Sequence, residues 1–227
     1  LAVAAQNNLS ETAFIVEQNG RYHIRWFSPK TEIAFCGHAT LASAYVLFNR
    51  VSDLSQIKFY AKAVGEFTVT KAQDGKIEMT FPQRHIEPVN SVPEALLEGL
   101  KPRPQEVYVD QQAYYVCYPS EDDVRSVTYD HPLIASLAPL DVCVTSTADD
   151  FDFVSRYFWP ANGGDEDPTT GSAHTSLAPF WSKKLGKDKL EAFQASSRGG
   201  EVSCSLQDAE VVISGYAAPY LEGTITI

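Results

Sequence analysis

Three side chains that can take up or release a proton lie beside turns of small residues. Glu11 begins a stretch of alternating apolar residues, whereas His38 and Asp167 each lie where a strand pattern gives way to a helical one. Carboxylates and imidazoles act as general acids and bases when a reacting group is within reach. Taken singly, each has a simpler interpretation: a solvated or capping glutamate, a histidine at a helix start, and an aspartate in an acidic loop. Local sequence leaves these alternatives open.

An internal repeat connects two of these residues. The segment "RWFSP" at 25–29 is echoed by "RYFWP" at 156–160, and "GHATLASA" at 37–44 is echoed by "GSAHTSLA" at 171–178. Two more echoes follow in the same order, "KFYAKAVGE" by "AFQASSRGGE" and "QDGKIEM" by "QDAEVVI". Such self-similarity indicates that one structural unit is built twice. His38 and Asp167 then lie near equivalent strand-to-helix turns.

Each half of the repeat predicts a strand with arginine and aromatic residues, a turn, a helix opened by glycine, and a hairpin. Asn19-Gly20 and Asp74-Gly75 are flanked by alternating apolar residues, which is typical of tight β-hairpins. The helices are expected after Gly37 and after Gly171, and the first contains so few polar residues that it looks buried nearly all round. These patterns predict an α+β fold in which a curved mixed sheet wraps a central helix, twice.

The segment 84–147 has no partner in the repeat. We expect helices in "PEALLEGL" and "HPLIASLAPL", two short strands in "EVYVDQQAYYVCYP", and an exposed connection in "PSEDDVR". This segment is expected to link the halves and to finish the first sheet. The predicted division is therefore 1–83 for the N-terminal half, 84–147 for the remainder and connection, and 148–227 for the C-terminal half.

Composition excludes several classes of function. Against 29 Asp and Glu there are only 18 Lys and Arg, giving a net charge of −11, and no basic stripe could neutralise a run of phosphates. No apolar run approaches the ~20 residues of a membrane span. The four cysteines are widely spaced without a CxxC pair, so no zinc site or redox dithiol is indicated. We expect a soluble, cytoplasmic protein without nucleic-acid or membrane partners, metal or cofactor.

The two helix starts predict an anion site. The first N–H groups of a helix lack partners within it and lie at the positive end of its dipole, so they suit a carboxylate. Small residues there would let the backbone approach a ligand closely. The candidate substrate-binding residues are Gly37, Ala39, Gly171, Ala173 and His174, although His174, one turn inside its helix, is also typical of a core histidine.

Two other chemistries are disfavoured. A serine nucleophile would need a GxSxG turn, and "TGSAH" lacks the second glycine after Ser172. A racemase with one cysteine in each half would need a thiol opposite Cys36, but the equivalent position is Thr170. Cys36 by itself is more typical of a buried structural thiol, and Ser172 of a helix cap or a donor to substrate.

The longest motifs resemble those of the PhzF family, the phenazine-biosynthesis-like proteins. They are "NLSETAF", "FCGHATLASAYVLF", "EDPTTGSAHTSLAPFW", "SRGGE" and "LEGTITI", and they extend from Leu9 to Ile227. The resemblance implies the duplicated fold of diaminopimelate epimerase, with two pseudo-symmetric halves and the active site in the cleft between them. The family's "DAF" and "GNPAA" motifs have no match, so we expect that the natural chain begins earlier and that the first half is truncated at its start.

The resemblance also implies a function, a cofactor-independent isomerase that moves a proton within a small carboxylate-bearing substrate. By its motifs Glu11 would be the proton shuttle, and His38, Asp167 and Ser172 would bind and polarise the substrate. The alternative is a catalytically silent member that binds a small molecule or another protein, and a two-base racemase is a third interpretation. A homodimer is expected because the family often forms one.

Overall fold

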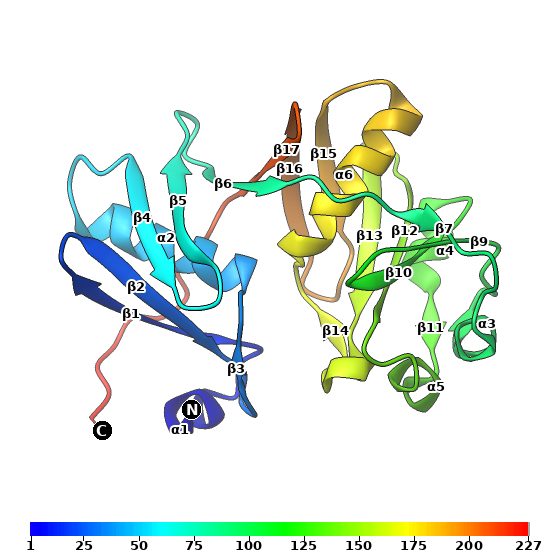
Figure 1. Cartoon of the computed structure of the whole chain (residues 1–227), viewed down its shortest axis with the longest axis horizontal. Helices are drawn as coiled ribbons and strands as arrows, with labels where there is room; N and C mark the ends of the chain where they lie inside the picture. Colours follow the sequence, from blue (N-terminus) through cyan, green and yellow to red (C-terminus); the bar gives the residue numbers. More distant parts are fainter. Residues whose placement is uncertain (227) are drawn as a thin grey trace. The chain divides into compact units, whose positions relative to one another are not determined.

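The computed structural model describes residues 1–226, which form two compact units (Figure 1). Unit 1 contains Leu1–Met79 and the C-terminal residues from Ser214 onward, whereas unit 2 is the continuous segment Thr80–Ile213. The division falls inside two strands, β6 and β17. Within the described residues, no helix is both long and apolar enough to span a membrane.

Unit 1 is a mixed sheet with one long helix. Its strands lie in the order β1-β2-β4-β5-β6, with β3 beside β2. The elements are α1 (Ala2–Asn7), β1 (Thr12–Gln18), β2 (Arg21–Phe27), β3 (Glu32–Ile33), α2 (Gly37–Arg50), β4 (Gln56–Ala61), β5 (Gly65–Lys71) and β6 (Ile77–Pro82). Both predicted hairpins are confirmed, with Asn19 and Gly20 at positive φ between β1 and β2 and Gly75 at positive φ between β5 and β6.

Helix α2 buries one face only. Its buried residues are Ala39, Thr40, Ser43, Ala44 and Phe48, whereas Val46 is 41% exposed. The prediction that this helix is buried nearly all round was therefore wrong. The buried positions recur every three to five residues, as expected of a helix packed on one side.

The strands of unit 2 pair in the order β17-β16-β15-β13-β12-β10-β9-β7, with β14 beside β13 and a separate β8-β11 pair. Its strands are β7 (Glu87–Pro88), β8 (Leu100–Lys101), β9 (Glu106–Val109), β10 (Ala113–Cys117), β11 (Thr128–Tyr129), β12 (Asp141–Thr147), β13 (Phe153–Phe158), β14 (Glu166–Asp167), β15 (Lys189–Gln194), β16 (Gly200–Gln207) and β17 (Glu210–Gly215). Its helices are α3 (Glu94–Gly99), α4 (Glu121–Ser126), α5 (His131–Ala135), the short 3₁₀ turn η1 (Pro160–Asn162) and α6 (Gly171–Leu185).

The repeat predicted from the sequence is confirmed strand by strand. In unit 1, β2 pairs antiparallel with β1 and β3 and parallel with β4; in unit 2, β13 pairs antiparallel with β12 and β14 and parallel with β15. The same ion pair recurs, because Arg25 donates two hydrogen bonds to Glu32 and Arg156 donates two to Glu166. The fold is the predicted α+β duplication.

The segment 84–147 differs from expectation. We expected it to finish the first sheet, but its strand β10 pairs parallel with β12, and the structure groups the segment with unit 2. "PSEDDVR" was predicted to be an exposed connection, and this was wrong: it contains α4. Ser120 caps that helix by accepting a hydrogen bond from Asp123 N at 3.1 Å, and Val124 is fully buried. Helix α5 covers only the first half of its predicted range.

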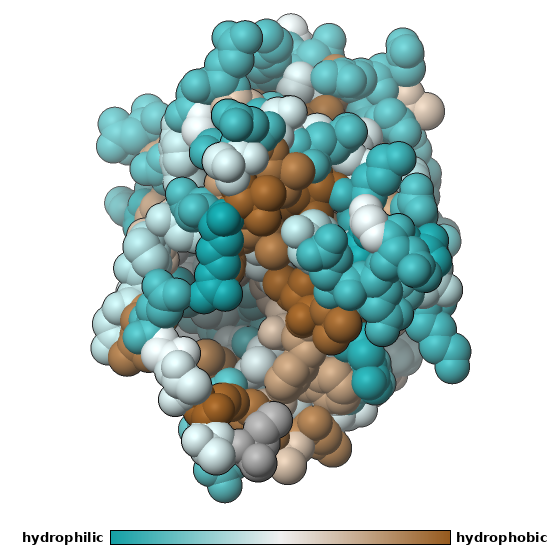
Figure 2. Space-filling model, turned by 90° about the vertical axis from the view of Figure 1, so that its left-hand side faces the viewer, coloured by the Kyte–Doolittle hydropathy of each residue, from teal (hydrophilic) through white to brown (hydrophobic). Residues whose placement is uncertain are grey.

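Apolar side chains reach the surface at several places. Figure 2 shows one face, on which apolar side chains form a strip bordered by hydrophilic ones. Unit 1 exposes several large apolar side chains, among them Val16, Val51, Val64, Tyr220 and Leu221. Neither the strip nor these exposed side chains tests the predicted homodimer, which stays a prediction.

Candidate functional site

In unit 1, three side chains meet where α2 begins. Glu11 precedes β1, Cys36 is the residue before α2, and His38 is the second residue of that helix. The Nε2 atom of His38 lies 2.8 Å from Glu11 Oε2 and 3.5 Å from Cys36 Sγ. The three ligand-type atoms all lie within 4.8 Å of one another. A carboxylate, an imidazole and a thiol therefore share one small volume.

The Glu11 carboxylate is buried and incompletely satisfied. Its side chain is only 10% exposed, against 35% for His38. Although Oε2 is close to the His38 ring, the contact lacks the alignment of a hydrogen bond, so this buried oxygen has no hydrogen-bond partner among the described residues. A buried polar atom without a partner costs free energy. Such atoms therefore often indicate a bound ligand, ion or water.

The backbone of α2 adds positive potential to this cluster. The helix begins at Gly37 without a side-chain cap from Cys36, and it runs for 14 residues. Its first N–H groups and its dipole consequently favour an anion at this end. The local sequence produces this geometry because Gly37 and Ala39 have no bulky side chain to cover the backbone.

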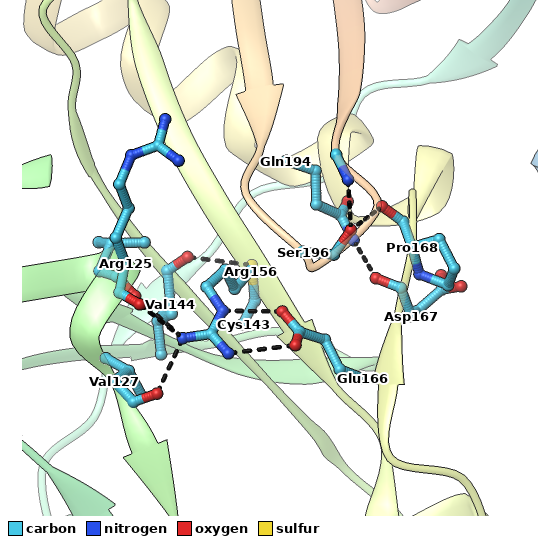
Figure 3. Close-up of polar contacts among 12 residues, drawn as sticks. Arg125, Val127, Cys143, Val144, Arg156, Glu166, Asp167, Pro168, Gln194 and Ser196 are labelled. Atoms are coloured by element: carbon cyan, nitrogen blue, oxygen red, sulfur yellow. Dashed lines mark hydrogen bonds and ion pairs between the residues drawn. The ribbon is translucent and has the colours of Figure 1, made fainter. Parts of the chain in front are cut away.

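In unit 2, a hydrogen-bonded frame holds the equivalent turn before α6. Gln194, only 1% exposed, donates a hydrogen bond to Asp167 O at 2.7 Å (Figure 3). It also accepts one from Thr170 N at 2.7 Å. The Thr170 hydroxyl donates to the Asp167 carboxylate. Like α2, α6 begins without a side-chain cap from its preceding residue. Asp167 and the uncapped end of α6 are thus fixed relative to each other.

Arg156 holds the strand that carries Asp167. Its guanidinium donates to both oxygens of Glu166, at 2.7 and 3.1 Å, and also to backbone carbonyl groups at the end of α4 (Figure 3). Paired donors of this kind match carboxylate geometry and fix direction as well as distance. Strand β14 is therefore tied to β13 by strand pairing and, through Arg156, to the end of α4.

Ser172 belongs to a second network, which begins at Gln112. The Gln112 side-chain amide donates to Ser172 Oγ and to the Tyr157 hydroxyl, both at 2.8 Å, while its oxygen accepts from Arg84 at 3.1 Å. Tyr157 in turn donates to Asp141 at 2.9 Å. Because Ser172 Oγ accepts from Gln112, its own hydroxyl proton is directed away from that residue.

Asp141 and Tyr157 are both perturbed by burial. Removal from water raises the pKa of the Asp141 carboxyl above its ordinary value, and the nearby Asp167 adds to this, although hydrogen bonds from Asn162 and Tyr157 oppose it. Burial, followed by the charge of Asp141, raises the pKa of the Tyr157 hydroxyl. The two groups therefore favour the arrangement seen, in which Tyr157 stays protonated and donates to the carboxylate.

His174 lies in the core of unit 2. It has no exposed surface, and its Nδ1 donates to Thr170 O at 2.9 Å. Its Nε2 is buried without a partner among the described residues, and burial lowers the pKa of the ring to about 4. The corresponding residue of unit 1 is Thr40, whose hydroxyl donates to Cys36 O at 2.6 Å. Both side chains bond the carbonyl group that precedes their helix.

Comparisons with known proteins match nearly the whole chain. The family model described as "Phenazine biosynthesis-like protein" matches residues 1–223. The chain belongs to this family. It is 43% identical to an uncharacterized isomerase of Pseudomonas aeruginosa, covering 99% of this chain and 85% of that protein. It is also 34% identical to the human phenazine biosynthesis-like domain-containing protein, covering 99% of this chain and 87% of that one.

A solved structure shares the fold closely. The crystal structure of a putative phenazine biosynthesis PhzC/PhzF protein from Clostridium difficile is 40% identical and superimposes with a TM-score of 0.92, covering all of this chain and 86% of that one. The predicted membership of the phenazine biosynthesis-like family is therefore confirmed.

The structure places the predicted site residues of this family member in two groups. Glu11, His38 and Gly37 lie together in unit 1, and Asp167, Ser172 and Gly171 lie around the start of α6 in unit 2. A side chain added at Gly171 would meet nothing within 4 Å, so the space there is open. Ala39, Ala173 and His174 are buried. The roles assigned to all these residues, and the cleft between the halves, stay predictions.

Sequence reasoning missed Gln112 and Asp141. Asp141 is the structural counterpart of Glu11. Thr12 pairs with Phe27 and Val142 pairs with Phe158 in equivalent registers, and each acidic residue directly precedes the first-named residue of its pair. The echo "RWFSP" and "RYFWP" fixes that register. The signal was therefore present, but it required knowing which strands pair. Gln112 lies outside the repeat and gave no signal.

Proposed function

We propose that this chain is a cofactor-independent isomerase in which Glu11 moves a proton within a small carboxylate-bearing substrate. Three bacterial relatives, 38–43% identical over 99% of the chain, carry the name isomerase, which supports the class of reaction. The observation that carries the proposal is the buried Glu11 carboxylate, with one oxygen lacking a hydrogen bond, 2.8 Å from His38 Nε2. A carboxylate held in this way can accept a proton from carbon without competition from solvent.

The proposed reaction neither consumes nor releases a proton. Glu11 takes a proton from one carbon of the substrate and returns it to another, so that a double bond shifts and nothing is oxidised. His38 hydrogen-bonds to the substrate and stabilises the charge that develops when the C–H bond breaks. The uncapped helix ends suit the substrate carboxylate, since their N–H groups favour an anion. Asp167 and Ser172 are assigned to binding the substrate's polar groups.

The proposal is tested by hydrogen exchange at carbon. The protein is incubated with a panel of small carboxylic acids in deuterated water, and carbon-bound deuterium is followed by NMR and mass spectrometry. Glu11→Gln should reduce the exchange rate by about 10²- to 10⁴-fold, which is the usual contribution of a positioned acid or base. Glu17→Gln is the matched control, because Glu17 is an exposed residue of the neighbouring strand β1.

The outcomes separate two functions. Undiminished exchange in Glu11→Gln would overturn the assigned role of this residue. A ligand that binds to the unmodified protein without any exchange at its carbon atoms would favour the alternative, a small-molecule-binding member without catalysis.

A further inference from the structure

Three side chains meet at the start of α2: Glu11, Cys36 and His38. The proton-transfer proposal gives no role to the Cys36 thiol. An imidazole nitrogen and a thiolate sulfur are the preferred ligands of Zn²⁺, and a carboxylate oxygen commonly completes such a site. We propose that Cys36 Sγ, His38 Nε2 and Glu11 Oε2 form a binding site for one zinc-class divalent cation. The spacing of the cysteines gave no indication of this, because Glu11 joins the other two through the fold.

The distances within the cluster suit a tetrahedral ion. Zinc bonds of about 2.0–2.3 Å at tetrahedral angles separate a sulfur and a nitrogen ligand by about 3.5 Å, and a nitrogen and an oxygen ligand by about 3.4 Å. Cys36 Sγ and His38 Nε2 are 3.5 Å apart. Glu11 Oε2 and His38 Nε2 are 2.8 Å apart and must separate slightly, which a rotation of the Glu11 side chain can provide.

A comparison of the two units supplies an independent argument. Asp141, the counterpart of Glu11, accepts hydrogen bonds from Tyr157 at 2.9 Å and from Asn162 at 2.8 Å, one on each oxygen. Glu11 Oε2 is buried to a similar degree but has no aligned donor. In unit 2, hydrogen-bond donors satisfy both oxygens of Asp141. In unit 1, Glu11 Oε2 has no such donor, and a cation would satisfy it.

Access and net charge favour a cation, and the Glu11 carboxylate with a Cys36 thiolate supplies two negative charges, which outweigh the roughly half positive charge at the start of α2. The His38 side chain is 35% exposed, so an ion can enter from solvent beside it. The chain carries a net charge of −11, which raises the local concentration of cations. Three protein ligands leave one position for water, as in open zinc sites. On binding, the Cys36 thiol releases its proton to solvent, and neutral His38 binds through Nε2.

A zinc ion at this site would affect the proposed isomerase reaction. This consequence rests on the proposed function. A cation bound to Glu11 Oε2 withdraws the carboxylate from proton transfer, so zinc should act as a reversible inhibitor that a chelator removes. Cation binding itself can be measured without any substrate. Failure of the exchange experiment and failure of the metal experiment are therefore distinguishable.

The test measures metal binding to the purified, chelator-treated chain. Zn²⁺ is titrated by calorimetry and by competition with a chromophoric chelator, and Co²⁺ is added separately as a spectroscopic substitute. We expect one Zn²⁺ per chain, and a sulfur-to-cobalt charge-transfer band that Cys36→Ser abolishes. Cys36→Ser and His38→Gln should each weaken zinc binding by more than about 100-fold, since loss of even an outer partner typically costs 10- to 100-fold.

His85→Gln is the matched control, because His85 is exposed and lies in unit 2. It should bind zinc as the unmodified chain does. If Cys36→Ser does not fold, as judged by circular dichroism, His38→Gln and Glu11→Gln carry the test. Absence of a stoichiometric zinc site, or binding that survives substitution of these ligands, would overturn the proposal, and so would a cobalt spectrum without a thiolate band.

Discussion

Acidification should destabilise this protein through His174. Burial lowers the pKa of the ring to about 4, whereas an unfolded histidine titrates near 6.5. Between these two pH values the unfolded chain binds a proton at this residue and the folded chain does not, so the free energy of unfolding falls as the pH falls. Above about pH 6.5 the neutral ring contributes its full stabilisation. Below about pH 4 the ring is protonated in both states, and the free energy of unfolding falls no further through this residue.

The size of the effect follows from the shift. Each pKa unit corresponds to 1.36 kcal/mol, so a shift from 6.5 to about 4 amounts to about 3 kcal/mol. This residue has no exposed surface, so solvent does not screen the effect. Three kcal/mol is a large part of the total stability of an ordinary domain.

The other unit suggests the substitution that isolates this effect. Thr40 makes the equivalent bond to the carbonyl group before α2, so His174→Thr keeps a donor to Thr170 O and removes the titrating ring. At pH 7 the variant should be less stable by roughly 2–4 kcal/mol, because the ring that packs near Phe153 leaves a cavity. The difference between the two proteins should shrink by about 3 kcal/mol as the pH falls from 7 to 4.

Urea unfolding followed by tryptophan fluorescence at several pH values measures this difference. Carboxyl groups such as Asp141 titrate in both proteins, so their contribution cancels in the comparison. His85→Gln, an exposed histidine, should follow the unmodified protein at every pH. A difference between His174→Thr and the unmodified chain that stays constant from pH 7 to pH 4 would refute the reasoning.

Two pairs of substitutions test the remaining structural arguments by urea or thermal unfolding. Arg156→Lys loses the bidentate pair and the contacts with α4, and should cost about 2–4 kcal/mol because a partly buried network is broken. Arg25→Lys, its exposed counterpart, should be nearly neutral, and equal losses at the two sites would contradict this. Gly164→Ala forces a methyl group into the Trp159 ring and should be clearly destabilising. Gly171→Ala, with open space around it, should unfold as the unmodified protein does.

The repeat made much of the fold predictable. Because its echoes preserve order and spacing, they located the two long helices, and Asn19-Gly20 located a hairpin through its backbone requirements. These signals are local, and each segment of the chain specifies them by itself. They also located Glu11 and His38 beside turns, although not their direct contact.

The parts that escaped prediction depend on contacts distant in the sequence. Strand β10 pairs parallel with β12, and no turn motif in the sequence indicates which strands pair in this way. Helix α4 is only six residues long, and its two buried apolar residues, Val124 and the C-cap Val127, are too few to reveal a helical face in the sequence. Gln112, between β9 and β10, donates to Ser172 at the start of α6, yet an amide side chain in a turn usually faces solvent.

The division of the chain has a consequence for synthesis on the ribosome. Unit 1 is made of the first 79 residues and of a segment that begins only at Ser214, whose side chains return to it through contacts such as Arg50 with Glu222 and Lys76 with Tyr216. Domains fold as their residues emerge. Unit 2, which is continuous, can therefore complete its core during translation, whereas unit 1 waits until the residues from Ser214 onward have left the exit tunnel. Nascent unit 1 lacks these contacts for that whole interval.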